Sequence, residues 1–229
     1  MTQRSIPSGA TPKVLIKAGT DVTVKGVDGD MVTAETESRW GLKVEKHSEA
    51  EFARARAAIG EVVLFDWHFK RPNFQSGDTP EEIIEVQFGG SGEVLVPFGS
   101  HIKVYAGKSI NVSGIQGQVD AFSGLSLNVQ GVRCLGNASA GWSMNVESQT
   151  ILGQDAIYTA GSDLRFQVAG LTSLRLRVKD IGGYWEARIG AGERSVYLKS
   201  GGDVTFVTDQ KVEPQPPGYI LGKIEKPAA

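Results

Sequence analysis

Hydrophobic and polar residues alternate in short stretches along this chain, and each stretch begins just after a glycine. Gly107, for example, is followed by a polar residue flanked by Ile110 and Val112, and the same phrase follows Gly124 and Gly141. Alternation with a period of two residues is typical of a strand with one buried face. The pattern therefore predicts an all-β chain built from short strands.

The phrase consists of a small residue, glycine, any residue, serine or aspartate, and then apolar, polar and apolar residues. Its glycines, which we predict to be the structural corners of a repeat, are Gly19, Gly107, Gly124, Gly141, Gly161 and Gly201. The last five are separated by 17, 17, 20 and 40 residues. Residues 182–187 are interpreted as a degenerate copy of the phrase that divides the 40-residue gap. Consecutive antiparallel hairpins would explain the alternation but not this regular return. We predict a single-stranded parallel β-solenoid (β-helix) with coils of about 17–21 residues.

Each corner glycine is expected to adopt a positive φ, and the serine or aspartate two residues later is expected to hydrogen-bond nearby backbone. Parallel stacking places equivalent residues of successive coils above one another. The polar positions Asn111, Asn128 and Asn145 are then a candidate ladder of side-chain amides, with a polar binding stripe as the alternative. The inward positions would be Ile110, Val112, Leu127, Val129, Met144, Val146, Leu164, Phe166, Val204 and Phe206.

The repeat divides the chain into five segments. Residues 1–12 are expected to form a flexible tail, residues 13–37 the first coil and residues 98–209 the main solenoid. Residues 210–229 are a tail whose prolines are expected to stop it from continuing the strand ladder.

The fifth segment, residues 38–97, is interpreted as a small α+β insertion near the N-terminus. Its pattern predicts one short helix at 50–58 and strands near 61–69, 83–88 and 93–97. Such an insertion would cap the open end of the solenoid, where strand edges would otherwise be exposed. A binding site on the insertion is the alternative interpretation.

Composition narrows the class of protein. The 229 residues carry a formal net charge of −2, with basic residues scattered among acidic ones, so nucleic acid is not an expected partner. The single cysteine, Cys134, excludes an internal disulfide and a cysteine-based metal cluster. The start of the chain lacks a secretion-signal pattern, and no apolar run is long enough to span a membrane. We expect a soluble, cytoplasmic protein without a membrane span.

The residues that could carry chemistry are dispersed. His47, His68 and His101 share no metal-ligand spacing, and Cys134 has no activating base beside it, so it is expected to be a small core residue. The acids that follow the corner glycines, such as Asp21, are explained by the turn itself. We therefore predict no catalytic residue, no metal and no cofactor. Candidate contacts for a sugar ligand are Trp142, Tyr184 and Trp185.

The glycine-punctuated phrasing of residues 98–209 resembles adhesin-like β-helix repeat proteins of unknown function from bacteria. The layout of a short polar start, a compact solenoid and a proline-containing tail also resembles bactofilins. Resemblance to bactofilins implies a cytoskeletal protein that polymerises end to end without nucleotide.

These observations predict a non-enzymatic structural or scaffolding protein that self-associates into an oligomer or polymer. The alternative is an adhesin-like module that binds carbohydrate or another surface polymer. A polysaccharide-active enzyme that uses the corner aspartates, such as Asp163, is the third hypothesis.

Overall fold

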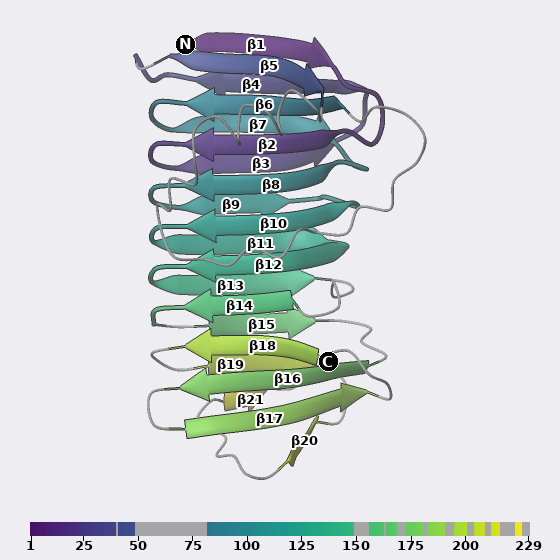
Figure 1. Ribbon diagram of the computed structural model, residues 1–229, viewed down its shortest axis with the longest axis vertical. Coiled ribbons are helices and arrows are strands. Elements are labelled where there is room, and N and C mark those ends of the chain that lie inside the picture. The colour runs from purple at the N-terminus through teal and green to yellow at the C-terminus, as the bar shows by residue number, and fades with distance from the viewer. Residues whose placement is uncertain are drawn as a thin grey trace.

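The computed structural model describes residues 1–39, 41–48, 82–147 and 160–162, and the strand backbones at 148, 156–159, 164–168, 173–180, 183–190, 195–200, 204–208, 212–215 and 223–225. These residues form two long β-sheets and, within the described ranges, no helix (Figure 1). The expected all-β class is confirmed for this part of the chain. The helix expected at 50–58 and the strand expected at 61–69 lie outside the described residues.

Strands from distant parts of the sequence lie side by side in each sheet. The ten-stranded sheet has the order β1 (Thr2–Pro7), β4 (Met31–Thr36), β7 (Gly92–Pro97), β3 (Val22–Val27), β9 (Ile110–Ser113), β11 (Ser126–Val132), β13 (Ser143–Ser148), β15 (Leu164–Val168), β19 (Val204–Thr208) and β21 (Lys223–Glu225). The eleven-stranded sheet has the order β5 (Leu42–Ser48), β6 (Glu82–Phe88), β2 (Lys13–Ala18), β8 (His101–Ala106), β10 (Gln118–Ser123), β12 (Cys134–Ala140), β14 (Ala156–Ala160), β18 (Ser195–Ser200), β16 (Ser173–Asp180), β17 (Gly183–Gly190) and β20 (Val212–Gln215).

The central part of the molecule repeats one simple unit. From β8 to β15, successive strands alternate between the two sheets, and each strand pairs in parallel with the next strand of its own sheet. Leu127, for example, lies between Ile110 and Met144, the residues 17 positions before and after it. The 17-residue return of the sequence phrase is thus the chain length between two neighbouring parallel strands. We call each such pair of consecutive strands a coil.

Both ends of the molecule depart from a purely parallel arrangement. The strand pairs β1–β4, β4–β7 and β5–β6 are antiparallel at one end, and β16–β17 and β17–β20 at the other. Both sheets are therefore mixed, and the parallel pairing expected for the first coil and the main solenoid does not hold for β4 or for the β16–β17 pair. Residues 182–187 are not a degenerate copy of the corner phrase, because β16 and β17 form an antiparallel pair in which Asp180 lies opposite Gly183.

The N-terminal region is not stacked in chain order. Strands β6 and β7, from the segment expected to be an inserted cap, pair in parallel with β2 and β3 and so extend both sheets. Residues 2–7, expected in a flexible tail, form the edge strand β1, which pairs with β4 (Figure 1). The order of the strands in space therefore differs from their order in the sequence.

The C-terminal tail also contributes strands, which corrects the expectation that its prolines would exclude it from the ladder. Strand β20 pairs with β17, with Pro214 opposite Ala187, and β21 pairs in parallel with β19. Strand β20 lies at the edge of its sheet. Proline is tolerated at an edge because its missing N–H group need not reach a neighbouring strand.

The apolar core lies between the two sheets. The inward positions expected from the alternation are buried as far as side chains are described, with Ile110, Leu127 and Met144 each at most 1% exposed. The small residues before Gly107, Gly124, Gly141 and Gly161 are buried too, including Ala140 at 2% and Ala160 at 2%, whereas Ala18 before Gly19 is partly buried. The side chains of Leu164, Phe166, Val204 and Phe206 lie outside the described part of the chain.

The corner glycines are required by close approach between coils, and the expectation of positive φ is wrong for those that are described. Gly19, Gly107, Gly124, Gly141 and Gly161 stack above one another, and a Cβ atom on each of the last four would collide with the carbonyl oxygen of the glycine before it. None of these five lies in the left-handed region. Gly201 lies outside the described residues.

Left-handed backbone occurs instead at a second glycine position of the coils. Gly114 has a φ of 69° and Gly131 a φ of 60°, and the N–H of Gly114 donates to the carbonyl of Gln130 at 3.1 Å. These glycines supply a conformation that residues with a Cβ atom rarely adopt.

Candidate binding groove on the ten-stranded sheet

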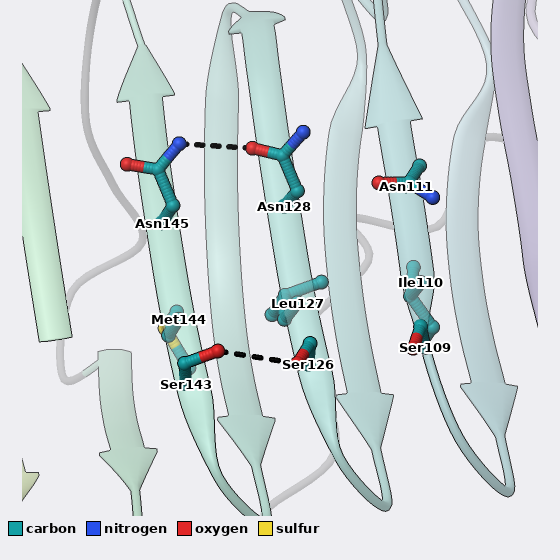
Figure 2. A pocket seen from close by; sticks show the side chains of 9 residues that line it. All are labelled: Ser109, Ile110, Asn111, Ser126, Leu127, Asn128, Ser143, Met144 and Asn145. Atoms are coloured by element: carbon teal, nitrogen blue, oxygen red, sulfur yellow. Dashed lines mark hydrogen bonds between the residues drawn. The ribbon is translucent and has the colours of Figure 1, made fainter. Parts of the chain in front are cut away.

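A shallow groove of about 470 Å³ crosses three parallel strands on the outer face of the ten-stranded sheet. Its lining residues come from β9, β11, β13 and the residue before β9, and are Ser109, Ile110, Asn111, Ser126, Leu127, Asn128, Ser143, Met144 and Asn145 (Figure 2). We call it the Ser–Asn groove. Each coil supplies one serine and one asparagine, two positions apart at the start of a strand, so both side chains point to the same outer face.

Asn111, Asn128 and Asn145 form one side of the groove, and we call them the asparagine row. They occupy matched positions on β9, β11 and β13, and the side-chain amide of Asn145 donates to Asn128 Oδ1 at 2.9 Å. Within the described part of the chain, the Asn111 amide makes no hydrogen bond to another side chain (Figure 2). The first amide of the row is therefore available to a ligand.

Ser109, Ser126 and Ser143 form the other side, which we call the serine row. The hydroxyls of Ser126 and Ser143 lie 3.1 Å apart and share a hydrogen bond (Figure 2). The sequence interpretation expected such serines to bond nearby backbone, whereas these two side chains bond one another across coils. The sequence pattern had not indicated this row as a ligand surface. Its signal was the spacing, because a serine two residues before each asparagine must share that residue's face.

An exposed apolar pair lies at the corners beside the serine row. Trp142 is 60% exposed and Leu125 is 47% exposed, and each immediately precedes a serine of the row. The N–H of Trp142 donates to the carbonyl of Leu125 at 2.8 Å, so the two corners lie on neighbouring coils. Of the predicted sugar contacts, only Trp142 is placed, because the side chains of Tyr184 and Trp185 in β17 lie outside the described part of the chain.

A second groove of about 510 Å³ lies on the same sheet and is acidic. It is lined by Asp21, Thr23, Glu35, Thr36, Glu37, Ser38, Ser91, Gly92 and Glu93. It adjoins the Ser–Asn groove because Thr23 lies opposite Asn111, and the N–H of Ser109 donates to Asp21 Oδ1 at 3.1 Å. Glu93 is paired with Lys25 at 2.8 Å. One end of the Ser–Asn groove is therefore bordered by negative charge.

The titratable groups with shifted pKa values lie on the other sheet. Burial lowers the pKa of His101 in β8, with a smaller contribution from the positive charge of Lys13. Burial also raises the pKa of Asp120 in β10, although the backbone N–H of Asn137 donates to Asp120 Oδ1 at 2.7 Å and opposes the shift. Cys134, expected in the core, is half-buried at the start of β12.

The described residues do not assemble the groups that metal chemistry needs. In that part of the chain, no cluster of three or more histidine, cysteine, aspartate or glutamate side chains is placed to hold a metal ion. His68, Asp163 and Asp203 are not described. The same part contains no helix that is long and apolar enough to cross a membrane.

The chemistry of the Ser–Asn groove is that of uncharged hydrogen bonding. None of its lining side chains is ionisable near neutral pH, while hydroxyls and primary amides each donate and accept hydrogen bonds. Such a surface suits recognition of a polar, uncharged ligand.

Comparison with known proteins adds little to this geometry. No protein-family model matches the chain, and no curated protein matches it. A crystal structure of a "putative cell adhesion protein" from Clostridium sporogenes covers 90% of this chain and 99% of its own, at 8% sequence identity and a TM-score of 0.40. A likeness at this level does not identify what this chain binds.

Proposed function

We propose that this protein is a non-enzymatic β-solenoid that binds an extended polymer on the outer face of the ten-stranded sheet. In this interpretation the stacked coils are a scaffold, and their adhesin-like role is to hold identical polar side chains in register. The observation that carries the proposal is the Ser–Asn groove, in which three coils present the same serine and asparagine at matched positions.

The geometry supports a repeating ligand over a compact one. Neighbouring strands lie about 4.8 Å apart, so the two rows offer the same pair of hydrogen-bonding groups at regular steps along the stack. A ligand that repeats along its own length can use each step in the same way. The cavity is also shallow and open, which suits a chain lying across it better than a small molecule enclosed in it.

The lining also supports binding without catalysis. General acid–base catalysis requires a group whose pKa lies near the working pH, and serine and asparagine do not supply one unaided. We therefore assign the groove a recognition role with no reaction at its surface.

The experiment that tests this proposal is nuclear magnetic resonance mapping on the full chain. Polymers of neutral, anionic and cationic sugars and an unstructured peptide would be titrated in turn. We expect one of them to shift the amide resonances of residues 126–128 and 143–145 first. Shifts confined to the eleven-stranded sheet, or no shift with any polymer, would contradict the proposal.

Self-association is the second candidate function. The observation that favours it is the edge strand β1, which among the described strands pairs with β4 alone and whose residues are mostly exposed. An unpaired edge can accept a strand from another copy. Light scattering coupled to size exclusion would show regular assemblies if this edge is used, and a monomer at every concentration would reject the hypothesis.

A further inference from the structure

We infer that the ligand of the Ser–Asn groove is a neutral polysaccharide whose chain runs along the stacking axis, with Trp142 and Leu125 contacting the faces of its sugar rings. This inference rests on the proposed function and adds the chemical class and direction of the ligand. It combines the uncharged lining, the unused amide of Asn111, the exposed corner pair and the negative border of the groove.

The direction of the bound polysaccharide chain follows from how the serine and asparagine rows run. Ser109, Ser126 and Ser143 run from coil to coil, and so do the asparagines, so both rows lie across the strands and along the stack. A sugar ring carries hydroxyls on opposite sides. One ring lying between the rows can therefore bond a serine on one side and an asparagine on the other.

A peptide fits this surface poorly. Extended peptides bind sheets by adding a strand at an edge, where backbone groups are unpaired. The strand beneath the middle of the groove, β11, is already paired with β9 on one side and β13 on the other. A ligand on this face must therefore bond side chains, which a hydroxyl-rich polymer does without backbone pairing.

Charge disfavours an anionic polymer. Asp21 and the acidic groove lie at one end of the Ser–Asn groove, and exposed Glu147 lies two residues beyond Asn145. The nine lining residues offer no positive charge to balance an anion, and the exposed Lys108 that precedes Ser109 is outnumbered by these carboxylates. Like charges brought together lower the affinity, so polyuronates and nucleic acids are disfavoured.

The apolar corner pair supplies what sugar recognition needs besides hydrogen bonds. A sugar ring has an apolar face of C–H groups, and an exposed indole offers a flat surface for it. Trp142 and Leu125 are exposed on neighbouring coils just outside the groove lining, each one residue before a serine of the row, and Lys108 holds the equivalent place on the preceding coil. An amphipathic aromatic residue with one wet face is typical of recognition surfaces.

The test is isothermal titration calorimetry with the full chain. The neutral probes are glucan, mannan, xylan and chitin oligosaccharides from disaccharide to hexasaccharide, and the charged probes are polygalacturonate and chitosan. An unstructured serine–glycine peptide is the non-sugar probe. We expect at least one neutral series to bind, with an affinity that rises with chain length until the three coils are spanned. Polygalacturonate and the peptide are expected not to bind.

Two variants and a matched control locate the site. Asn111→Ala is expected to weaken binding about fivefold to tenfold, through loss of a ligand hydrogen bond. Its unfolding temperature is expected to stay unchanged, because this amide holds no protein side chain. Trp142→Ala is expected to weaken binding about tenfold. Gln87→Ala, which removes an exposed amide from the eleven-stranded sheet, is expected to change nothing.

Each other outcome has a definite meaning. Binding of polygalacturonate, chitosan or the peptide in place of neutral sugars, lost on Asn111→Ala, would overturn this inference and leave the proposed function standing. Binding of a neutral sugar that neither variant weakens would overturn the assigned site. No binding by any probe would reject both the inference and the proposed function.

Discussion

The carbonyl group of Gly107 lies where a Cβ atom on Gly124 would stand, with the carbonyl carbon 3.0 Å from that position. Gly124 Cα approaches so closely because its N–H donates to Ala106 and continues the parallel ladder through the corner at 3.0 Å. A side chain at Gly124 can be accommodated only if the two coils separate. The corner glycine is therefore a packing requirement between coils.

Gly124→Ala is expected to lower the free energy of unfolding by about 2–3 kcal/mol, because the new methyl group meets backbone that cannot move aside alone. Chemical denaturation followed by circular dichroism measures this change. A variant as stable as the parent would show that the coils are not held at this distance in solution.

Gly131 is the matched control, since a Cβ there meets no atom closer than 3.9 Å but the backbone has a φ of +60°. Gly131→Ala is expected to lower stability by about 1–2 kcal/mol, and Gly131→Asn by less, because asparagine tolerates the left-handed region. At Gly124 the order should reverse, with asparagine at least as damaging as alanine. Equal effects of asparagine at both positions would contradict the two different roles.

Leu127→Asp is expected to unfold the stack, because Leu127 is 1% exposed between the sheets and an aspartate there would bury an unpaired charge. Asn128→Ser, at the next position but on the outer face, is expected to lower the free energy of unfolding by only about 1 kcal/mol through loss of the bond from Asn145. Thermal unfolding of both variants measures the contrast. Equal tolerance would mean that the two faces of β11 are assigned the wrong way round.

Asp120 fills the irregular pairing between β10 and β12, where the register shifts between Val119 and Ala121. Its carboxylate accepts the N–H of Asn137 and occupies the space that a side chain on Gly136 would need. Asp120→Ala is expected to lower stability by about 1–3 kcal/mol, because the Asn137 N–H is left unsatisfied. Asp120→Asn keeps the acceptor oxygen and is expected to fold.

The parent and Asp120→Asn are also expected to differ in how their stability depends on pH. Because burial raises the pKa of Asp120 above its ordinary 3.8, the folded state binds the proton more tightly than the unfolded state. Its stabilising effect is complete below pH 3.8 and is lost as the pH rises through the folded pKa. Asp120→Asn should therefore gain stability over the parent as the pH is raised from acid to neutral. Parallel stability curves for parent and variant would contradict the buried carboxyl.

For His101, stability is expected to change with pH in the opposite direction. Its Nδ1 accepts the N–H of Gln118 at 3.4 Å, and burial lowers the pKa of the imidazole below 6.5. The stabilising effect of the neutral ring is present above pH 6.5 and is lost as the pH falls through the folded pKa. Relative to His101→Gln, which cannot titrate, the parent should lose stability on acidification from neutral pH. Denaturation curves of the two proteins at several pH values measure this difference.

The sequence by itself determined the repeating unit of this protein. Alternation with a period of two places Ile110, Leu127 and Met144 inward and their polar neighbours outward, because side chains of a strand point to opposite faces. The two 17-residue returns from Gly107 to Gly141 then determined which residues are neighbours across these coils, and so aligned the asparagine row. Both signals are local, since each depends on residues within one or two coils.

Only the tertiary structure decided the strand positions and directions that depend on pairing between segments far apart in the sequence. The position of β6 and β7 beyond β2 and β3, the antiparallel pair β16–β17 and the strands of the proline-containing tail all arise from contacts between remote segments. A strand carries the same alternation whether its neighbour is parallel or antiparallel. The packing role of Gly124 and the hydrogen bond within the serine row were not predicted for the same reason, because each is a contact between coils and not a property of one coil.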